Sequence, residues 1–138
     1  MYSSIQLIEH IKQSFEKAEN KKSQINNDII NMEGMTGIYT RHFYNNLLSI
    51  DNINYLEVGT WKGSSVCSAM FNNKSNVVAI DNFKQHNGPK TEFYKNFNKY
   101  KGNNDALFIE NDYKNVIFDK NKKFNIYLYD GDHSYEST

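Results

Sequence analysis

The sequence predicts an α/β fold with three α/β/α layers, in which N-terminal helices precede a mainly parallel sheet. The first observation is the alternation of short apolar runs, typical of buried strands, with segments of helical periodicity. Such alternation joins parallel strands through crossover helices that pack on the sheet. The second is the length of 138 residues, which suits a single domain. We expect a helical segment over residues 1–50 and a sheet-bearing segment over 51–138, together forming one compact unit.

Two helices are predicted in the first fifty residues. Ser3 can cap the first helix, and Gln6 stands at the reciprocal position of a capping box. The apolar residues of this helix fall on one stripe, formed by Ile5, Ile8, Ile11 and Phe15. After a polar stretch and a glycine-containing loop, the second helix runs from about Tyr39 to Leu48.

The rest of the chain reads as strands that alternate with helices. The expected strands are Asn54 to Val58, Asn76 to Ile80, Ala106 to Glu110 and Phe124 to Tyr129. Between them we expect a helix from Ser64 to Phe71, a helix with Pro89 in its first turn, and a short helix or turn from Tyr113 to Phe118. Ligands of parallel sheets bind outside the carboxyl ends of the strands, so residues at those ends are the candidates for a functional site.

Composition excludes several classes of function. Lys plus Arg and Asp plus Glu number 16 each, so the net charge is zero, which argues against a nucleic-acid-binding protein. Arg41 is the only arginine and hence the only candidate for bidentate phosphate recognition. With Cys67 as the only cysteine, no intramolecular disulfide can form, and a reducing cytoplasm is the expected location. No apolar run is long enough to span a membrane, so we expect no membrane partner.

The turn after the first predicted strand is the first candidate site. Gly59 and Gly63 let the backbone approach a ligand closely, and the following helix presents free N–H groups to an anion. Trp61 stands where a dinucleotide-binding turn needs glycine to approach a pyrophosphate. The pattern therefore favours a ligand with a carboxylate and no diphosphate, the alternative being an ordinary strand-to-helix turn.

Two aspartates follow the next strands. Asp81 ends the second predicted strand, where a carboxylate can accept both hydroxyls of a ribose; the alternative is an aspartate that caps a turn. Asp112 follows the third strand and could accept a hydrogen bond from an adenine amino group, although Asn-Asp is also a common turn pair.

The fourth strand runs into a segment rich in groups that can bind ligands. Asp130, Asp132 and His133 bring two carboxylates and an imidazole together. This combination suits a divalent metal, general-base chemistry, or both. The imidazole can take a proton at neutral pH because its ordinary pKa lies near 6.5. The alternative is a polar loop with a capping aspartate.

The order of these motifs resembles class I S-adenosylmethionine-dependent methyltransferases. Leu56 to Ser65 looks like motif I of that family, most closely of the catechol O-methyltransferase-like branch with an aromatic residue at the middle position. Tyr129 to Glu136 resembles the Asp-Gly-x-His-x-Tyr motif of a bacterial and viral group in the family, and Gly34-Met35-Thr36 is also similar to that group. The resemblance implies a Rossmann-like fold and an enzyme that transfers a methyl group to a hydroxyl of a small molecule or sugar.

The resemblance also implies roles for single residues. Gly59 and Gly63 would lie against the methionine part of S-adenosylmethionine, with Ser65 at its carboxylate. Asp81 would hold the ribose and Asp112 would lie near the adenine. The full set of residues implied to bind the cofactor is Glu57, Gly59, Thr60, Trp61, Gly63, Ser65, Asp81, Asp112 and Asp130.

Two residues are implied to act in catalysis. Asp130 falls where related O-methyltransferases place a metal ligand, so Mg²⁺ is an expected second cofactor. His133 falls where some of them place the base that removes the proton of the acceptor hydroxyl.

Other readings stay open because the sequence ends at Thr138, just after the fourth strand, whereas a complete domain of this family has several more strands. The chain is then a fragment or a shortened protein, and a non-catalytic module that binds S-adenosylmethionine or a partner is one alternative. An NAD-dependent oxidoreductase is disfavoured by Trp61 and by the lack of a Tyr-x-x-x-Lys pair. Cleavage of S-adenosylmethionine without methyl transfer is a further alternative. We also expect a homo-oligomer that covers the unpaired sheet edge.

Overall fold

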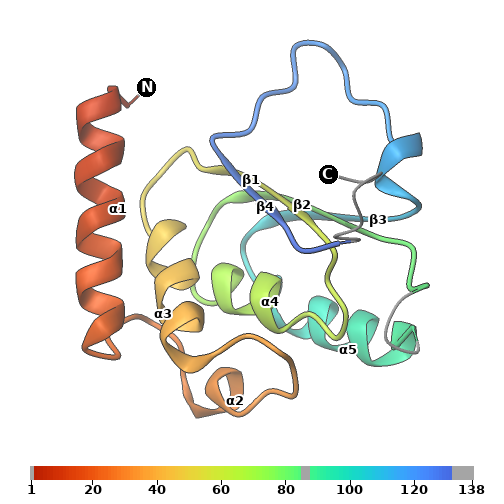
Figure 1. Ribbon diagram of the computed structural model, residues 1–138, viewed down its shortest axis with the longest axis horizontal. Coiled ribbons are helices and arrows are strands. Elements are labelled where there is room, and N and C mark those ends of the chain that lie inside the picture. The colour runs from red at the N-terminus through yellow and green to blue at the C-terminus, as the bar shows by residue number, and fades with distance from the viewer. Residues whose placement is uncertain (1, 85–87, 132–138) are drawn as a thin grey trace.

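The centre of the protein is a four-stranded sheet whose strands are all parallel. The computed structural model describes residues 2–84 and 88–131 (Figure 1). The strands are β1 (Asn54–Val58), β2 (Asn76–Asp81), β3 (Asp105–Glu110) and β4 (Ile126–Tyr129). Their order, β3-β2-β1-β4, is the order of the first four strands of a Rossmann-like sheet. The predicted α/β class with a parallel sheet is confirmed, and all four carboxyl ends lie at one edge.

One face of the sheet packs on helices. These are α3 (Ile38–Leu47), α4 (Ser64–Met70) and α5 (Lys90–Tyr100), and Figure 1 shows α4 and α5 side by side along that face. The expected apolar face of α5 is confirmed by Phe93 and Phe97, which are buried against α4 and the strands. Alternate strand residues, such as Tyr55 and Val77, point into this core, as the period of a strand requires.

The other face lacks the helical layer that the sequence predicts. Its core of Val58, Val78 and Ile80 is covered by the connection between β3 and β4, which contains only the 3₁₀ helix η1 (Tyr113–Asn115). Within the described residues, the three-layer prediction is thus wrong for this face. The physical reason is that residues 116–124 carry no helical apolar stripe, because the polar run Asp-Lys-Asn-Lys-Lys at 119–123 separates their apolar residues.

The N-terminal helices form a side layer beside the sheet (Figure 1). In α1 (Ser4–Glu19) the predicted capping box is confirmed: Ser3 and Gln6 cap each other's backbone. However, α1 packs on α3 through the face that carries Ser14 and Ala18. The stripe of Ile5, Ile8, Ile11 and Phe15 stays between 49% and 80% exposed, and the ring of Phe15 contacts α3, edge-on against Phe43.

The segment between α1 and α3 holds a short helix that its polar sequence does not predict. This is α2 (Asn27–Ile30), which Asn26 caps by accepting a hydrogen bond from the backbone N–H of Ile29. Ile29 is fully buried, so tertiary packing forms a helix that is too short to be stable alone.

Among the described residues, no helix combines the length and the apolar character needed to cross a lipid bilayer.

Candidate functional site

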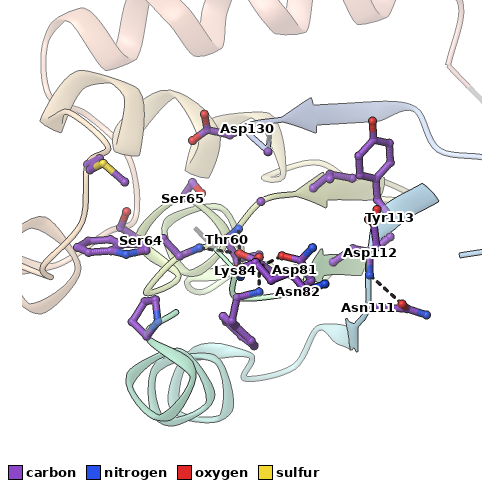
Figure 2. A pocket seen from close by; sticks show the side chains of 18 of the residues that line it. Thr60, Ser64, Ser65, Asp81, Asn82, Lys84, Asn111, Asp112, Tyr113 and Asp130 are labelled. Atoms are coloured by element: carbon purple, nitrogen blue, oxygen red, sulfur yellow. Dashed lines mark hydrogen bonds between the residues drawn. The ribbon is translucent and has the colours of Figure 1, made fainter. Parts of the chain in front are cut away.

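A cavity of about 900 Å³ opens at the carboxyl ends of the strands, within the usual size of small-molecule sites (Figure 2). Seven of the predicted site residues line it, namely Gly59, Thr60, Trp61, Ser65, Asp81, Asp112 and Asp130. Glu57 and Gly63 do not line the cavity and lie behind its wall. His133 lies outside the described residues. The sheet therefore brings together most of the residues that the sequence places at strand ends.

The turn after β1 has a left-handed backbone at three positions. Gly59 has φ +89°, Gly63 has φ +95°, and Trp61 has φ +46°. A side chain at Gly59 would overlap the backbone carbonyl of Asp130, and one at Gly63 would press on the ring of Phe93. The two glycines are therefore required by the contacts of the turn with β4 and α5, in addition to any approach of a ligand.

Asp81 holds this turn against β2. Its Oδ2 atom accepts hydrogen bonds from the backbone N–H and hydroxyl of Thr60, at 2.8 and 3.1 Å, and from the N–H of Trp61 at 3.1 Å (Figure 2). Its Oδ1 atom accepts one from the N–H of Phe83 at 2.9 Å. Since each carboxylate oxygen has about two acceptor positions, Oδ1 retains capacity for a ligand hydroxyl while Oδ2 is saturated.

Glu57 is fully buried behind Ser65. Its Oε1 atom accepts a hydrogen bond from the hydroxyl of Tyr55 at 2.6 Å, and its Oε2 atom accepts one from the hydroxyl of Ser65 at 2.8 Å. Burial raises the pKa of Glu57 to about 7; repulsion from Asp130 and Asp81 acts in the same direction, against the two hydrogen bonds. Glu57 therefore touches the cavity only through Ser65.

The loop before α3 forms one wall of the cavity, with Met35 and Thr36 among the lining residues. The hydroxyls of Thr36 and Ser64 lie 2.9 Å apart, and Lys62 forms an ion pair with Glu33 at 2.7 Å. The loop thus contacts the beginning of α4. The family resemblance includes Gly34-Met35-Thr36, but the sequence alone assigns these residues no role in ligand binding.

Arg41 organises that loop from inside. Its buried guanidinium donates hydrogen bonds to five backbone carbonyls, those of Ile29, Ile30, Met32, Gly34 and Thr36. Burial lowers the pKa of Arg41. All three guanidinium nitrogens are engaged, so the only arginine of the chain holds the backbone and is not available for phosphate recognition.

The far rim of the cavity comes from the end of β3. Asp112 lines the cavity as predicted, and it also caps η1 by accepting a hydrogen bond from the N–H of Lys114 at 3.0 Å. Asn111 and Lys84 are further lining residues that sequence reasoning missed (Figure 2). Their position after a strand was the available signal, but polar residues are common in such turns.

The described residues contain no group of three His, Cys, Asp or Glu side chains that could hold a metal ion. Of the predicted metal and base residues, only Asp130 is described, and it lines the cavity beside the turn after β1. Asp132 and His133 lie outside the described residues.

The chain was also compared with known proteins. No protein-family model, curated protein or solved structure gives a significant match to it.

Proposed function

We propose that this protein binds S-adenosylmethionine in the cavity and transfers its methyl group to a hydroxyl of a small molecule or sugar. One observation carries the proposal: the turn after β1, the aspartate that ends β2 and the aspartates after β3 and β4 line a single cavity, at the edge of a parallel sheet where such ligands bind. These are the positions at which the sequence resembles class I methyltransferases.

The lining residues fit the parts of this ligand. Asp81 retains acceptor capacity at Oδ1, and the hydroxyl oxygen of Thr60 can accept a hydrogen bond as well, so both can serve ribose hydroxyls. Asp112 and Tyr113 offer an acceptor and an aromatic ring to the adenine at the β3 side. Ser64 and Ser65, at the beginning of α4, are the lining residues that we propose to bind the methionine end.

In the proposed reaction, S-adenosylmethionine supplies an electrophilic methyl group on its sulfonium. The protein has to orient the acceptor hydroxyl and take up its proton. His133 is the residue we propose as the base, on its place in the motif alone. Mg²⁺ is proposed as a second cofactor on the resemblance alone: Asp130, which lines the cavity, would hold it, and the ion would polarise the acceptor hydroxyl.

A second candidate is a module that binds S-adenosylmethionine without catalysis. It rests on the described lining residues, whose proposed roles all lie in binding the cofactor. We also propose a cytoplasmic location, on the single buried cysteine.

Calorimetric titration of the purified chain with S-adenosylhomocysteine and, separately, with NADH tests the proposal. We expect micromolar binding of the first ligand and none of the second. Binding of NADH alone would favour an oxidoreductase, and binding of neither would overturn the proposed cofactor.

Methyl transfer is tested next with a panel of hydroxylated small molecules and sugars and a labelled methyl group. His133→Ala should keep binding of S-adenosylhomocysteine and lose turnover. Full turnover in this variant would show that His133 is not the base. Binding without turnover on any acceptor would favour the non-catalytic module.

A further inference from the structure

α1 is held against α3 by small and polar side chains. The buried side chains of α1 are Ser14 and Ala18, and its exposed stripe contributes the edge of the Phe15 ring against Phe43. The side-chain amide of Asn46 on α3 donates a hydrogen bond to the backbone carbonyl of Ser14 at 3.1 Å. Docking of α1, which lies at the side of the molecule next to α3, therefore removes little apolar surface from water (Figure 1). We expect the release of α1 to cost less free energy than the unfolding of the sheet.

A histidine of α3 is buried in this interface. His42 is 3% exposed, and its Nδ1 atom lies 2.8 Å from the hydroxyl oxygen of Ser23 in the turn after α1. Among the described residues, its Nε2 atom has no hydrogen-bond partner. The neutral imidazole has one N–H donor, whereas the imidazolium has two and needs two acceptors. The interface thus offers one partner to a side chain that needs two when it is protonated.

The charges around His42 disfavour its protonated form. Neither of the two ion pairs among the described residues includes His42, and the carboxylates of α1 are exposed. The charged group that acts on the imidazole is the ammonium of Lys21, which has the same sign as an imidazolium. The next polar side chains along α3, Asn45 and Asn46, are neutral. Burial, together with Lys21, therefore lowers the pKa of His42 below its ordinary value of 6.5.

The second histidine of the interface behaves differently. His10 on α1 donates from Nε2 to the backbone carbonyl of Leu47, the last residue of α3, at 2.9 Å. An imidazolium keeps this hydrogen bond, and a cation is favourable at the C-terminal end of a helix. Protonation of His10 therefore does not oppose docking, and the sensitivity to acid rests on His42.

We propose that α1 is a pH-sensitive latch, which docks on α3 while His42 is neutral and is released when His42 takes up a proton. Release brings the imidazole into water, which supplies acceptors for both of its N–H groups. Docking is complete above pH 6.5 and weakens as the pH falls below that value. Since one proton is taken up, the equilibrium constant for release rises by at most about tenfold for each pH unit. The cavity contains neither His42 nor Lys21, so the latch is independent of the ligand proposed for the cavity.

The test is thiol labelling of the Ser14→Cys variant of the full chain with 4,4′-dithiodipyridine, which reacts with thiols in weakly acidic solution. The hydroxyl of Ser14 is buried and has no hydrogen-bond partner among the described residues, so the substitution breaks no hydrogen bond. We expect the labelling of this thiol, relative to the urea-unfolded protein at the same pH, to accelerate below pH 6.5 toward the limit of about tenfold per pH unit. Cys67, the native cysteine, is buried in α4 and reports opening of the core. Its labelling should stay far slower at each pH.

Two histidine variants assign the effect. When Ser14→Cys is combined with His42→Gln, the labelling should no longer depend on pH. When it is combined with His10→Gln, the matched control, the pH dependence should remain. An unchanged pH dependence in His42→Gln would overturn the role of His42.

Hydrogen exchange of the unmodified chain decides the question even if His42→Gln does not fold. Between about pH 7.5 and pH 5, the opening of α1, corrected for intrinsic exchange rates, should increase while β1 and β2 stay protected. Opening of α1 that does not change with pH would overturn the latch. Loss of protection in α1 and the sheet at the same free energy would also overturn it, since acid would then act on the whole fold.

Discussion

At the scale of the residue, Asp81 has a structural role that does not depend on a ligand. Its carboxylate accepts four hydrogen bonds from the turn after β1 and from its own loop. A carboxylate at this position was expected as a ribose ligand. The geometry adds that its removal also leaves backbone N–H groups of Thr60, Trp61 and Phe83 without their acceptor.

Asp81→Ala should therefore lower the free energy of unfolding by roughly 2–3 kcal/mol, as lost hydrogen bonds to a charged group predict, in addition to weakening ligand binding. Urea denaturation measures the first effect without any ligand. Asp112→Ala is the control, because Asp112 caps only a short 3₁₀ helix and should cost less than about 1 kcal/mol. An Asp81→Ala variant as stable as the wild type would contradict this role.

Glu57 gives a prediction for stability against pH. Its pKa is raised from 4.5 to about 7 in the folded protein, so between these values the folded state holds a proton that the unfolded state has lost. The contribution of Glu57 to the free energy of unfolding is therefore complete below pH 4.5. It declines by roughly 3 kcal/mol as the pH rises to 7. Urea denaturation at a series of pH values should show that Glu57→Gln removes this decline. Parallel curves for the two proteins would show that the carboxylate titrates normally.

At the scale of the element, the loop between α2 and α3 depends on one side chain. Arg41 donates to two carbonyls at the end of α2 and to three in this loop, which forms a wall of the cavity through Met35 and Thr36. Lysine has a single ammonium group and cannot reach all of them.

Arg41→Lys should thus cost roughly 2–3 kcal/mol of stability and speed hydrogen exchange over residues 29–37. Thermal denaturation and hydrogen exchange detected by mass spectrometry check the two effects. Lys62→Gln removes the ion pair with the exposed Glu33 and should cost less than about 1 kcal/mol. Unchanged exchange in Arg41→Lys would mean that the loop is held by other contacts.

The sequence predicts elements well where the signal is local. The capping box at Ser3, the strand Asn54–Val58 and the phenylalanine face of α5 all rest on local chemistry or period. Strand ends also predict most of the cavity, because a parallel sheet brings them to one edge.

The rest depends on contacts between distant segments. α2 forms because Ile29 is buried, and the isoleucines of the α1 stripe stay exposed because Ser14 and Ala18 fit α3. The segment after η1 replaces a helical layer. The wall formed by Thr36 against Ser64 joins residues that lie 28 positions apart. The backbone that requires a glycine at position 59 is that of Asp130, which directly follows β4 and is distant in the sequence.

At the scale of the whole molecule, apolar side chains remain at the surface. Leu107 and Tyr127, on the two outer strands, are 55% and 58% exposed on the sheet face without a helical layer. The stripe of α1 adds a second apolar surface. Outer strands and exposed apolar faces of this kind favour association.

We therefore predict that the purified chain associates at micromolar concentration, with a mass by light scattering above the 16.2 kDa of one chain. Leu107→Lys combined with Tyr127→Lys should shift the protein toward the monomer, because the added charges would be buried on association. Ile8→Lys, on the stripe of α1, tests in the same way whether that surface takes part in the association. A monomeric wild type at this concentration would contradict the prediction.

Trp61 is the only tryptophan of the chain, and it stands in the wall of the cavity. The tryptophan fluorescence of the protein, excited at wavelengths where its tyrosines do not absorb, therefore originates at the site itself, from an indole with the ammonium of Lys62 4.8 Å from its ring. An aromatic ligand that enters the cavity should change the intensity or the wavelength of this emission. The protein thus carries its own optical reporter, and candidate ligands can be screened without a label or an engineered probe.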